Sequence, residues 1–141
     1  MNKKKFFTSV AIALSLIVSI SILSSCGQVV DKLIDKMVVE GNKQCPVSLN
    51  SDTRLDSITH PGKGILEYSY TLINFSKENL SVSEDEALPM AKKMVIESIK
   101  NTTSKELIAI LKLNAIFRYT YYGKDGELLF TFDVTPEEYN K

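Results

Sequence analysis

Two thiols and one imidazole are the side chains of this sequence with the strongest chemistry, and the thiol of Cys26 has the most informative surroundings. Cys26 follows Leu23-Ser24-Ser25 and precedes Gly27. A cysteine sulfur is a good nucleophile when ionised, and this one stands directly after two small residues at the end of an apolar run. The setting predicts that Cys26 is acylated, which would fix the chain to a membrane.

The run before Cys26 has the composition of a secretory signal. Lys3, Lys4 and Lys5 form a short cationic start, and residues 6–23 carry no charge. Positive residues before an apolar stretch are typical of signal peptides. A retained membrane helix is the alternative, because ~20 apolar residues at ~1.5 Å rise are enough to span a bilayer.

Leu23-Ser24-Ser25-Cys26 resembles the lipobox of bacterial prolipoproteins, in which a signal peptidase cuts just before a diacylated cysteine. The resemblance covers residues 1–27. It implies a signal peptide over 1–25 and a mature protein that begins at Cys26 with acyl chains such as palmitate. Gly27 stands where an aspartate retains some lipoproteins in the inner membrane, so the resemblance implies the outer membrane of the cell envelope. The lack of an acidic run after Cys26 favours a domain that faces the periplasm.

Charge and length limit the classes of partner and the size of the domain. The chain has 17 basic and 17 acidic side chains, and removal of residues 1–25 with three lysines leaves 14 and 17, a formal charge of −3. No basic stripe of the kind that binds nucleic acid is present in the sequence. The remaining 116 residues are enough for one small domain. We expect a lipid-anchored helix or tether over 26–44 and the domain over 45–141.

The other chemical side chains do not form a catalytic set. Cys45, without an intramolecular partner once Cys26 is acylated, is read as a small buried side chain, with a reactive or pairing thiol as the alternative. His60 is the only histidine, which disfavours zinc. Asp56 would share a strand face with His60 at ~13 Å, too far for a triad. We therefore expect no catalytic residue, no metal and no cofactor, and a solvated His60 at a turn.

Residue periodicity predicts helices over 28–40, from a cap at Ser83 to about 101, and after a cap at Ser104. Ser83 and Glu86 match a capping box, and Pro89 should kink this helix or delay its start. Alternating residues predict strands over 53–60, 65–74, 115–122 and 127–134. Glycine-containing turns at 61–64 and 123–126 join them into two hairpins, and a last helical turn follows at 135–138.

The expected order is therefore αββααββ. Two hairpins with two or three helices predict an α+β domain, with a four-stranded antiparallel sheet covered on one face. The outline resembles a group of small bacterial envelope proteins over most of residues 45–139. The matching pieces are 53–58, Tyr68-Ser69-Tyr70-Thr71 and 117–122. The resemblance supports the architecture and implies no catalytic role.

Strand aromatic residues are the candidate binding residues. Tyr68, Tyr70, Tyr119 and Tyr121 belong to the core if they face the helices. If they face outward, they form a flat platform with Arg118 nearby, and tyrosine and arginine are common anchors of recognition surfaces.

Two functions remain open at this stage. The first is a non-enzymatic, lipid-tethered module that binds another envelope protein. The second is a protein that binds a small ligand or an envelope polymer on its aromatic sheet face. A wide aromatic pocket would favour the second function, whereas a filled core would disfavour it.

Overall fold

The computed structural model describes residues 29–141. The predicted signal peptide and the predicted acylation site at Cys26 therefore lie outside the described residues. Within the described part of the chain, no helix has both the length and the apolar character needed to cross a membrane.

The described strands form one five-stranded sheet in the order β1-β2-β3-β4-β5. The strands are β1 (Val47–Ser48), β2 (Thr53–Thr59), β3 (Ile65–Leu72), β4 (Ile116–Gly123) and β5 (Leu128–Val134). The two predicted hairpins are present as the antiparallel pairs β2–β3 and β4–β5.

The predicted four-stranded antiparallel sheet is wrong in two respects, although the α+β class is confirmed. A short edge strand, β1, adds a fifth strand. The two hairpins also meet through β3 and β4, which run parallel from Ile65 opposite Ile116 to Leu72 opposite Gly123. The reason is the long helical connection between them, because a crossover of this length returns the chain to the same end of the sheet.

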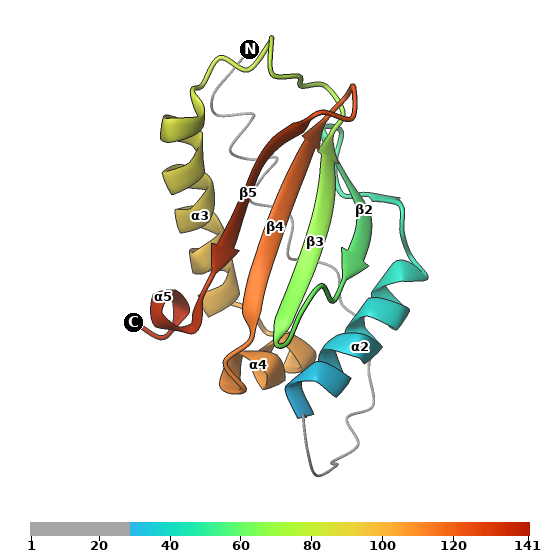
Figure 1. Cartoon of the computed structure of the whole chain (residues 1–141), viewed down its shortest axis with the longest axis vertical. Coiled ribbons are helices and arrows are strands. Elements are labelled where there is room, and N and C mark those ends of the chain that lie inside the picture. The colour runs from blue at the N-terminus through green and yellow to red at the C-terminus, as the bar shows by residue number, and fades with distance from the viewer. Residues whose placement is uncertain (1–28) are drawn as a thin grey trace.

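The described helices are α2 (Val29–Asn42), α3 (Glu84–Lys100), α4 (Lys105–Lys112) and the short α5 (Pro136–Tyr139). Figure 1 shows α2 beside β2, α3 beside β5, and α4 near the ends of β3 and β4 from which these strands begin. Apolar residues of α2, α3 and α4 join one core with residues of the sheet. The prediction that the first helix docks on the sheet is thus confirmed, through Leu33, Ile34 and Met37.

Helix ends follow the sequence closely, with one exception. Ser104 caps α4, since its Oγ accepts a hydrogen bond from the N–H of Leu107 at 3.3 Å. Ser83 precedes α3 as predicted but makes no capping hydrogen bond with its side chain, so the predicted capping box is wrong. Pro89 lies inside α3 and does not delay its start, which is Glu84. Asn114 ends the α4 region with a φ of 60°, a left-handed conformation that asparagine adopts more readily than most residues.

Candidate functional site

The helix-covered face of the sheet carries two rows of stacked aromatic rings. Tyr119 of β4 lies opposite Tyr68 of β3 and Phe132 of β5, with ring centroids 5.5 Å from each. In the next row, Tyr121 stacks on Tyr70 at 5.0 Å and on Phe130 at 4.8 Å. The alternation of the three strands, read in their observed register, places all six rings on one face.

These tyrosines are buried. Tyr68 is 5% exposed, and Tyr70, Tyr119 and Tyr121 are 0% exposed. Burial raises the pKa of each phenol because the charged form loses its hydration. The core interpretation of the tyrosines is therefore confirmed. No described tyrosine of this set contributes to an exposed aromatic platform.

The hydroxyl of Tyr119 is unusual in this array. It is buried and has no hydrogen-bond partner among the described residues. Leaving a buried hydroxyl unpaired costs roughly 1–3 kcal/mol of stability, and such groups are rare in native proteins. Tyr139, by contrast, is also buried, and its hydroxyl donates to the carbonyl of Ala115 at 2.7 Å.

The helices that flank these rings pack against the margins of the sheet. Contacts with strands are made mainly by α2 on β2 and β3 and by α3 on β5. Figure 1 shows the same arrangement, with α2 beside β2, α3 beside β5, and the strands β3 and β4 between the two helices. Tyr119 and Tyr121 thus belong to a strand that lies between the two helices.

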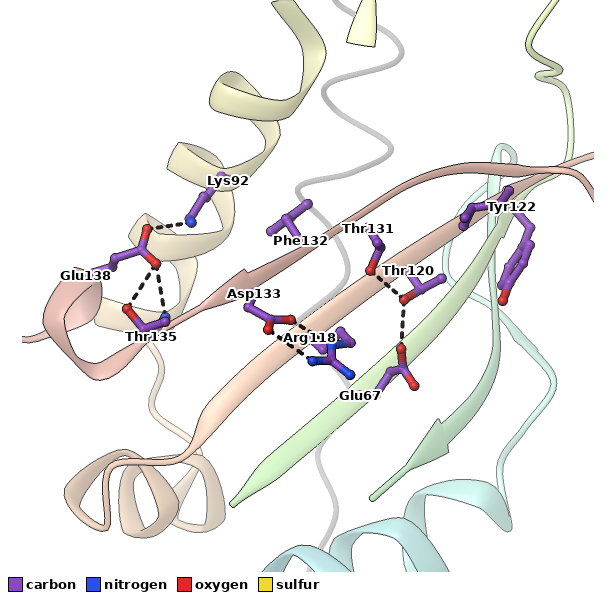
Figure 2. Close-up of a pocket in the computed structure, with 11 residues that line it drawn as sticks. Glu67, Lys92, Arg118, Thr120, Tyr122, Thr131, Phe132, Asp133, Thr135 and Glu138 are labelled. Atoms are coloured by element: carbon purple, nitrogen blue, oxygen red, sulfur yellow. Dashed lines mark hydrogen bonds and ion pairs between the residues drawn. The ribbon is translucent and has the colours of Figure 1, made fainter. Parts of the chain in front are cut away.

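The opposite face of the sheet is polar. Arg118 of β4 donates two hydrogen bonds to Asp133 of β5, from Nε at 2.8 Å and from an Nη atom at 3.1 Å (Figure 2). Asp133 and the negative charge of Glu67 both raise the pKa of Arg118, and burial opposes this more weakly than the hydrogen bond to Asp133. Thr120, two residues further along β4, donates a hydrogen bond to Glu67 at 2.8 Å.

An open hollow of about 620 Å³ lies on this polar face and extends to α3 and α5. Figure 2 shows its lining. Lys92 of α3 pairs with Glu138 of α5 at 2.8 Å, so the cations at this hollow are already matched with carboxylates. The polar face is consequently a network of satisfied pairs.

The predicted binding residues are divided between the two faces. Arg118 follows Phe117 and precedes Tyr119 in β4, and it points away from the tyrosines because successive strand residues alternate in direction. The predicted platform combined Arg118 with the four tyrosines on the condition that the tyrosines face outward. The structure therefore places Arg118 and the four tyrosines on opposite faces of the sheet.

His60 is held by helix α2, contrary to the expectation of a solvated side chain. Its Nδ1 lies 2.7 Å from Oδ1 of Asp35 and its Nε2 lies 3.0 Å from Oδ1 of Asp31. Its side chain is only 16% exposed. Burial opposes protonation of the ring, but hydrogen bonds and charges of the two carboxylates outweigh it, and the pKa of His60 is raised. Asp56 lies elsewhere and binds Arg54 and Thr71, so the structure contains no His60–Asp56 pair.

Cys45 is partly buried, with its Sγ 3.4 Å from the carbonyl oxygen of Gly41. Burial is the main cause that raises its pKa, which makes the thiol a weaker nucleophile at neutral pH. This is the behaviour of a structural thiol. Within residues 29–141, histidine, cysteine and carboxylate side chains do not gather in groups that could hold a metal ion.

Three solved structures of bacterial proteins have a similar fold. A candidate secreted protein of Pseudomonas aeruginosa is 15% identical with a TM-score of 0.61, over 82% of this chain and 98% of that chain. The pilotin EpsS of the Vibrio vulnificus type 2 secretion system is 12% identical with a TM-score of 0.58, over 78% and 91%. The type 2 secretion pilotin AspS of Vibrio cholerae is 15% identical with a TM-score of 0.56, over 77% and 91%. At these identities the likeness establishes the fold alone.

Among proteins with curated descriptions, none matches this chain. The sequence profile of one family matches residues 28–130, which is most of the chain and includes α2, the two hairpins up to the first residues of β5, and the helices between them. The chain therefore belongs to the family described as a domain of unknown function, DUF8479.

Proposed function

We propose that this chain is a lipid-anchored protein of the bacterial envelope that binds another protein and has no enzymatic activity. The anchor is acylated Cys26, and the expected position is the outer membrane with the domain in the periplasm. Two of the structures with this fold are pilotins of type 2 secretion systems. A pilotin is by this description one part of a secretion system, which supports a protein partner for this chain as well.

One observation carries the choice of binding surface, namely the unpaired buried hydroxyl of Tyr119. A partner segment that enters between α2 and α3 and offers a carbonyl oxygen would give this hydroxyl an acceptor. The partner segment would also pack against the stacked aromatic rings around Tyr119. Tyrosines that become buried in an interface often contribute much of the binding energy. The partner segment would enter the space between α2, which packs on β2 and β3, and α3, which packs on β5.

The polar face is the weaker candidate for the partner surface. Its charged side chains already form ion pairs with one another, as Arg118 does with Asp133 and Lys92 with Glu138. A partner that displaced these pairs would have to replace each of them, with little net gain for exposed charges.

Crosslinking in intact cells tests this proposal, with the native lipidated protein as bait and mass spectrometry as readout. The expected result is one stoichiometric protein partner from the envelope. The matched control is Cys26→Ser, which should leave an unprocessed precursor that does not reach the membrane position of the wild type. Crosslinks to the bait alone would contradict a protein partner and point to an oligomer of this chain or to a small ligand.

A further inference from the structure

One end of the domain is formed by three segments that are distant in sequence. The first turn of α2 reaches the turn between β2 and β3, where Oδ1 of Asp31 accepts a hydrogen bond from the N–H of Gly64 at 2.7 Å. The carbonyl of Gly64 in turn accepts from the N–H of Ile116, the first residue of β4, at 2.7 Å. Helices α2 and α4 also pack against each other. Figure 1 shows this end at the bottom of the view, with the start of α2 beside α4.

This end is basic at its surface. The lysines of its three segments are all exposed: Lys32, Lys63, Lys105 and Lys112. Within residues 29–141, none of these four lysines forms an ion pair. Leu113, which follows Lys112, is 40% exposed and is one of the few large apolar side chains on the surface of the described chain.

The carboxylates at the same end are engaged in other contacts. Asp31 and Asp35 bind His60, and Asp31 also accepts from Gly64. Glu106 accepts a hydrogen bond from the hydroxyl of Ser104 at the start of α4. Asp35 is exposed as well, so four exposed lysines face three carboxylates at this end, two of which are also bound to His60.

The opposite end of the domain is acidic. It comprises the loop before α3, the first turn of α3 and the β4–β5 turn, which Figure 1 shows together at the top. Its loops are joined by the N–H of Lys124, which donates to the carbonyl of Phe75 at 2.7 Å, and by the pair of Lys77 with Glu127 at 3.4 Å. Its exposed acidic residues are Glu78, Glu84, Asp85, Glu86, Asp125 and Glu127. The long axis of the domain thus runs from a basic to an acidic end.

We propose that the basic end lies on the membrane and contacts the headgroups of anionic phospholipids, so that the acidic end points away from the bilayer. This inference rests on the lipid anchor of the proposed function. Cys26 is three residues before Val29, the first residue of α2, and three residues span at most ~11 Å. An anchor at Cys26 therefore keeps the first turn of α2, and with it Lys32 and Lys63, close to the membrane surface.

The lipid anchor and the attraction of the lysines to anionic lipids reinforce each other. A lipid chain limits the domain to the surface layer, where lysines are attracted to anionic lipids over a distance of about 8–10 Å at physiological salt. The acidic end is repelled by the same surface. Leu113 can then enter the headgroup region, as apolar side chains of interfacial proteins do.

The test uses the full lipidated protein in vesicles, with a fluorophore on Leu113→Cys in a Cys45→Ala background and a lipid-bound quencher. Acylation blocks the sulfur of Cys26, so labelling is confined to position 113. In vesicles that contain phosphatidylglycerol, we expect at least twofold stronger quenching than in pure phosphatidylcholine. The difference should disappear in 1 M salt and in the triple variant Lys32→Gln, Lys63→Gln and Lys112→Gln.

The matched control removes the same charge at other places, with Lys77→Gln, Lys93→Gln and Lys124→Gln. It should retain the quenching of the parent protein. Co-flotation with the vesicles, measured in the same samples, reports the anchor separately. Protein that floats with both vesicle types but shows equal quenching in both would overturn the orientation and leave the anchor intact. Protein that fails to float would overturn the anchor itself.

Discussion

The Nε2 atom of His60 lies 3.0 Å from Oδ1 of Asp31, a residue 29 positions earlier in the chain. The other ring nitrogen lies 2.7 Å from Oδ1 of Asp35, one helical turn further along α2. A ring that contacts a carboxylate at each nitrogen donates at both only as the imidazolium. Helix α2 is thereby fixed to the end of β2 by a charged bridge as well as by its apolar face.

This bridge predicts a dependence of stability on pH. The pKa of His60 is raised above 6.5, so its stabilising effect is complete below 6.5 and is lost as pH rises through the raised value. The pKa of Asp31 is lowered below 3.8, mainly by the hydrogen bond from Gly64, so its effect is present above 3.8 and is lost as pH falls through the lowered value. The bridge should therefore be strongest between pH 3.8 and 6.5.

Urea unfolding of the wild type and His60→Gln across pH measures the effect. Glutamine keeps hydrogen-bonding capacity but has no charge, and we expect it to lower the free energy of unfolding by about 1 kcal/mol in that window. The difference should shrink above the window. Because His60 is the only histidine, a difference that stays constant from pH 5 to pH 9 would contradict the charged bridge.

Replacement of Tyr119 by phenylalanine should stabilise the domain. The change removes a buried hydroxyl without a partner and keeps the stacked ring, so the free energy of unfolding should rise by about 1 kcal/mol. Tyr139→Phe is the matched control, since it deletes a hydroxyl that donates to Ala115 and should lower stability by about 1 kcal/mol. Denaturant unfolding of both variants gives the comparison, and a loss of stability in Tyr119→Phe similar to that in Tyr139→Phe would contradict the assignment of Tyr119 as unpaired.

Gly123 is predicted to tolerate no side chain. A Cβ atom at this position would lie 2.9 Å from the carbonyl oxygen of Phe75 and 3.3 Å from the Cα of Ser76. Both are backbone atoms, so relief would require movement of the 75–76 segment. Gly123→Ala should lower the free energy of unfolding by about 2–3 kcal/mol. Gly62→Ala, whose Cβ would meet only a side-chain atom at 3.4 Å, should change it by less than about 1 kcal/mol.

Two helix-start serines should differ in their contribution to stability. Ser104→Ala removes the acceptor of the Leu107 N–H and should lower the free energy of unfolding by about 1 kcal/mol. Ser83→Ala removes no capping hydrogen bond and should have an effect within about 0.5 kcal/mol. Thermal or urea unfolding of the two variants distinguishes them, and equal losses would show that Ser83 caps α3 in solution.

Local features of the fold could be predicted from the sequence, and long-range ones could not. The helix starts near Ser83 and Ser104 and the two hairpins follow from residue spacing and turn glycines within short stretches. The parallel pairing of β3 with β4 depends on how the connection through α3 and α4 returns to the sheet, and no local pattern reports this. The two-residue strand β1 is too short to show any alternation.

The candidate site could also be predicted from the sequence only in its local features. Alternation indicated that the tyrosines share a face, but their register across β3, β4 and β5 decides that they stack in rows. The contact of His60 with Asp31 and Asp35 joins residues 25 and 29 positions apart. The spacing of the two aspartates by one helical turn was the signal available for it, because residues four apart lie on one helix face.

The most direct test of the account is partner capture by crosslinking in intact cells, repeated with two variants that report the two sheet faces. Tyr119→Phe removes the unpaired hydroxyl from the aromatic face, and Arg118→Ala breaks the pair with Asp133 on the polar face. The account predicts a single envelope partner whose capture falls several-fold in Tyr119→Phe, although that variant is more stable, and is unchanged in Arg118→Ala. Capture that is lost in Arg118→Ala and retained in Tyr119→Phe would contradict it and assign the partner to the polar face.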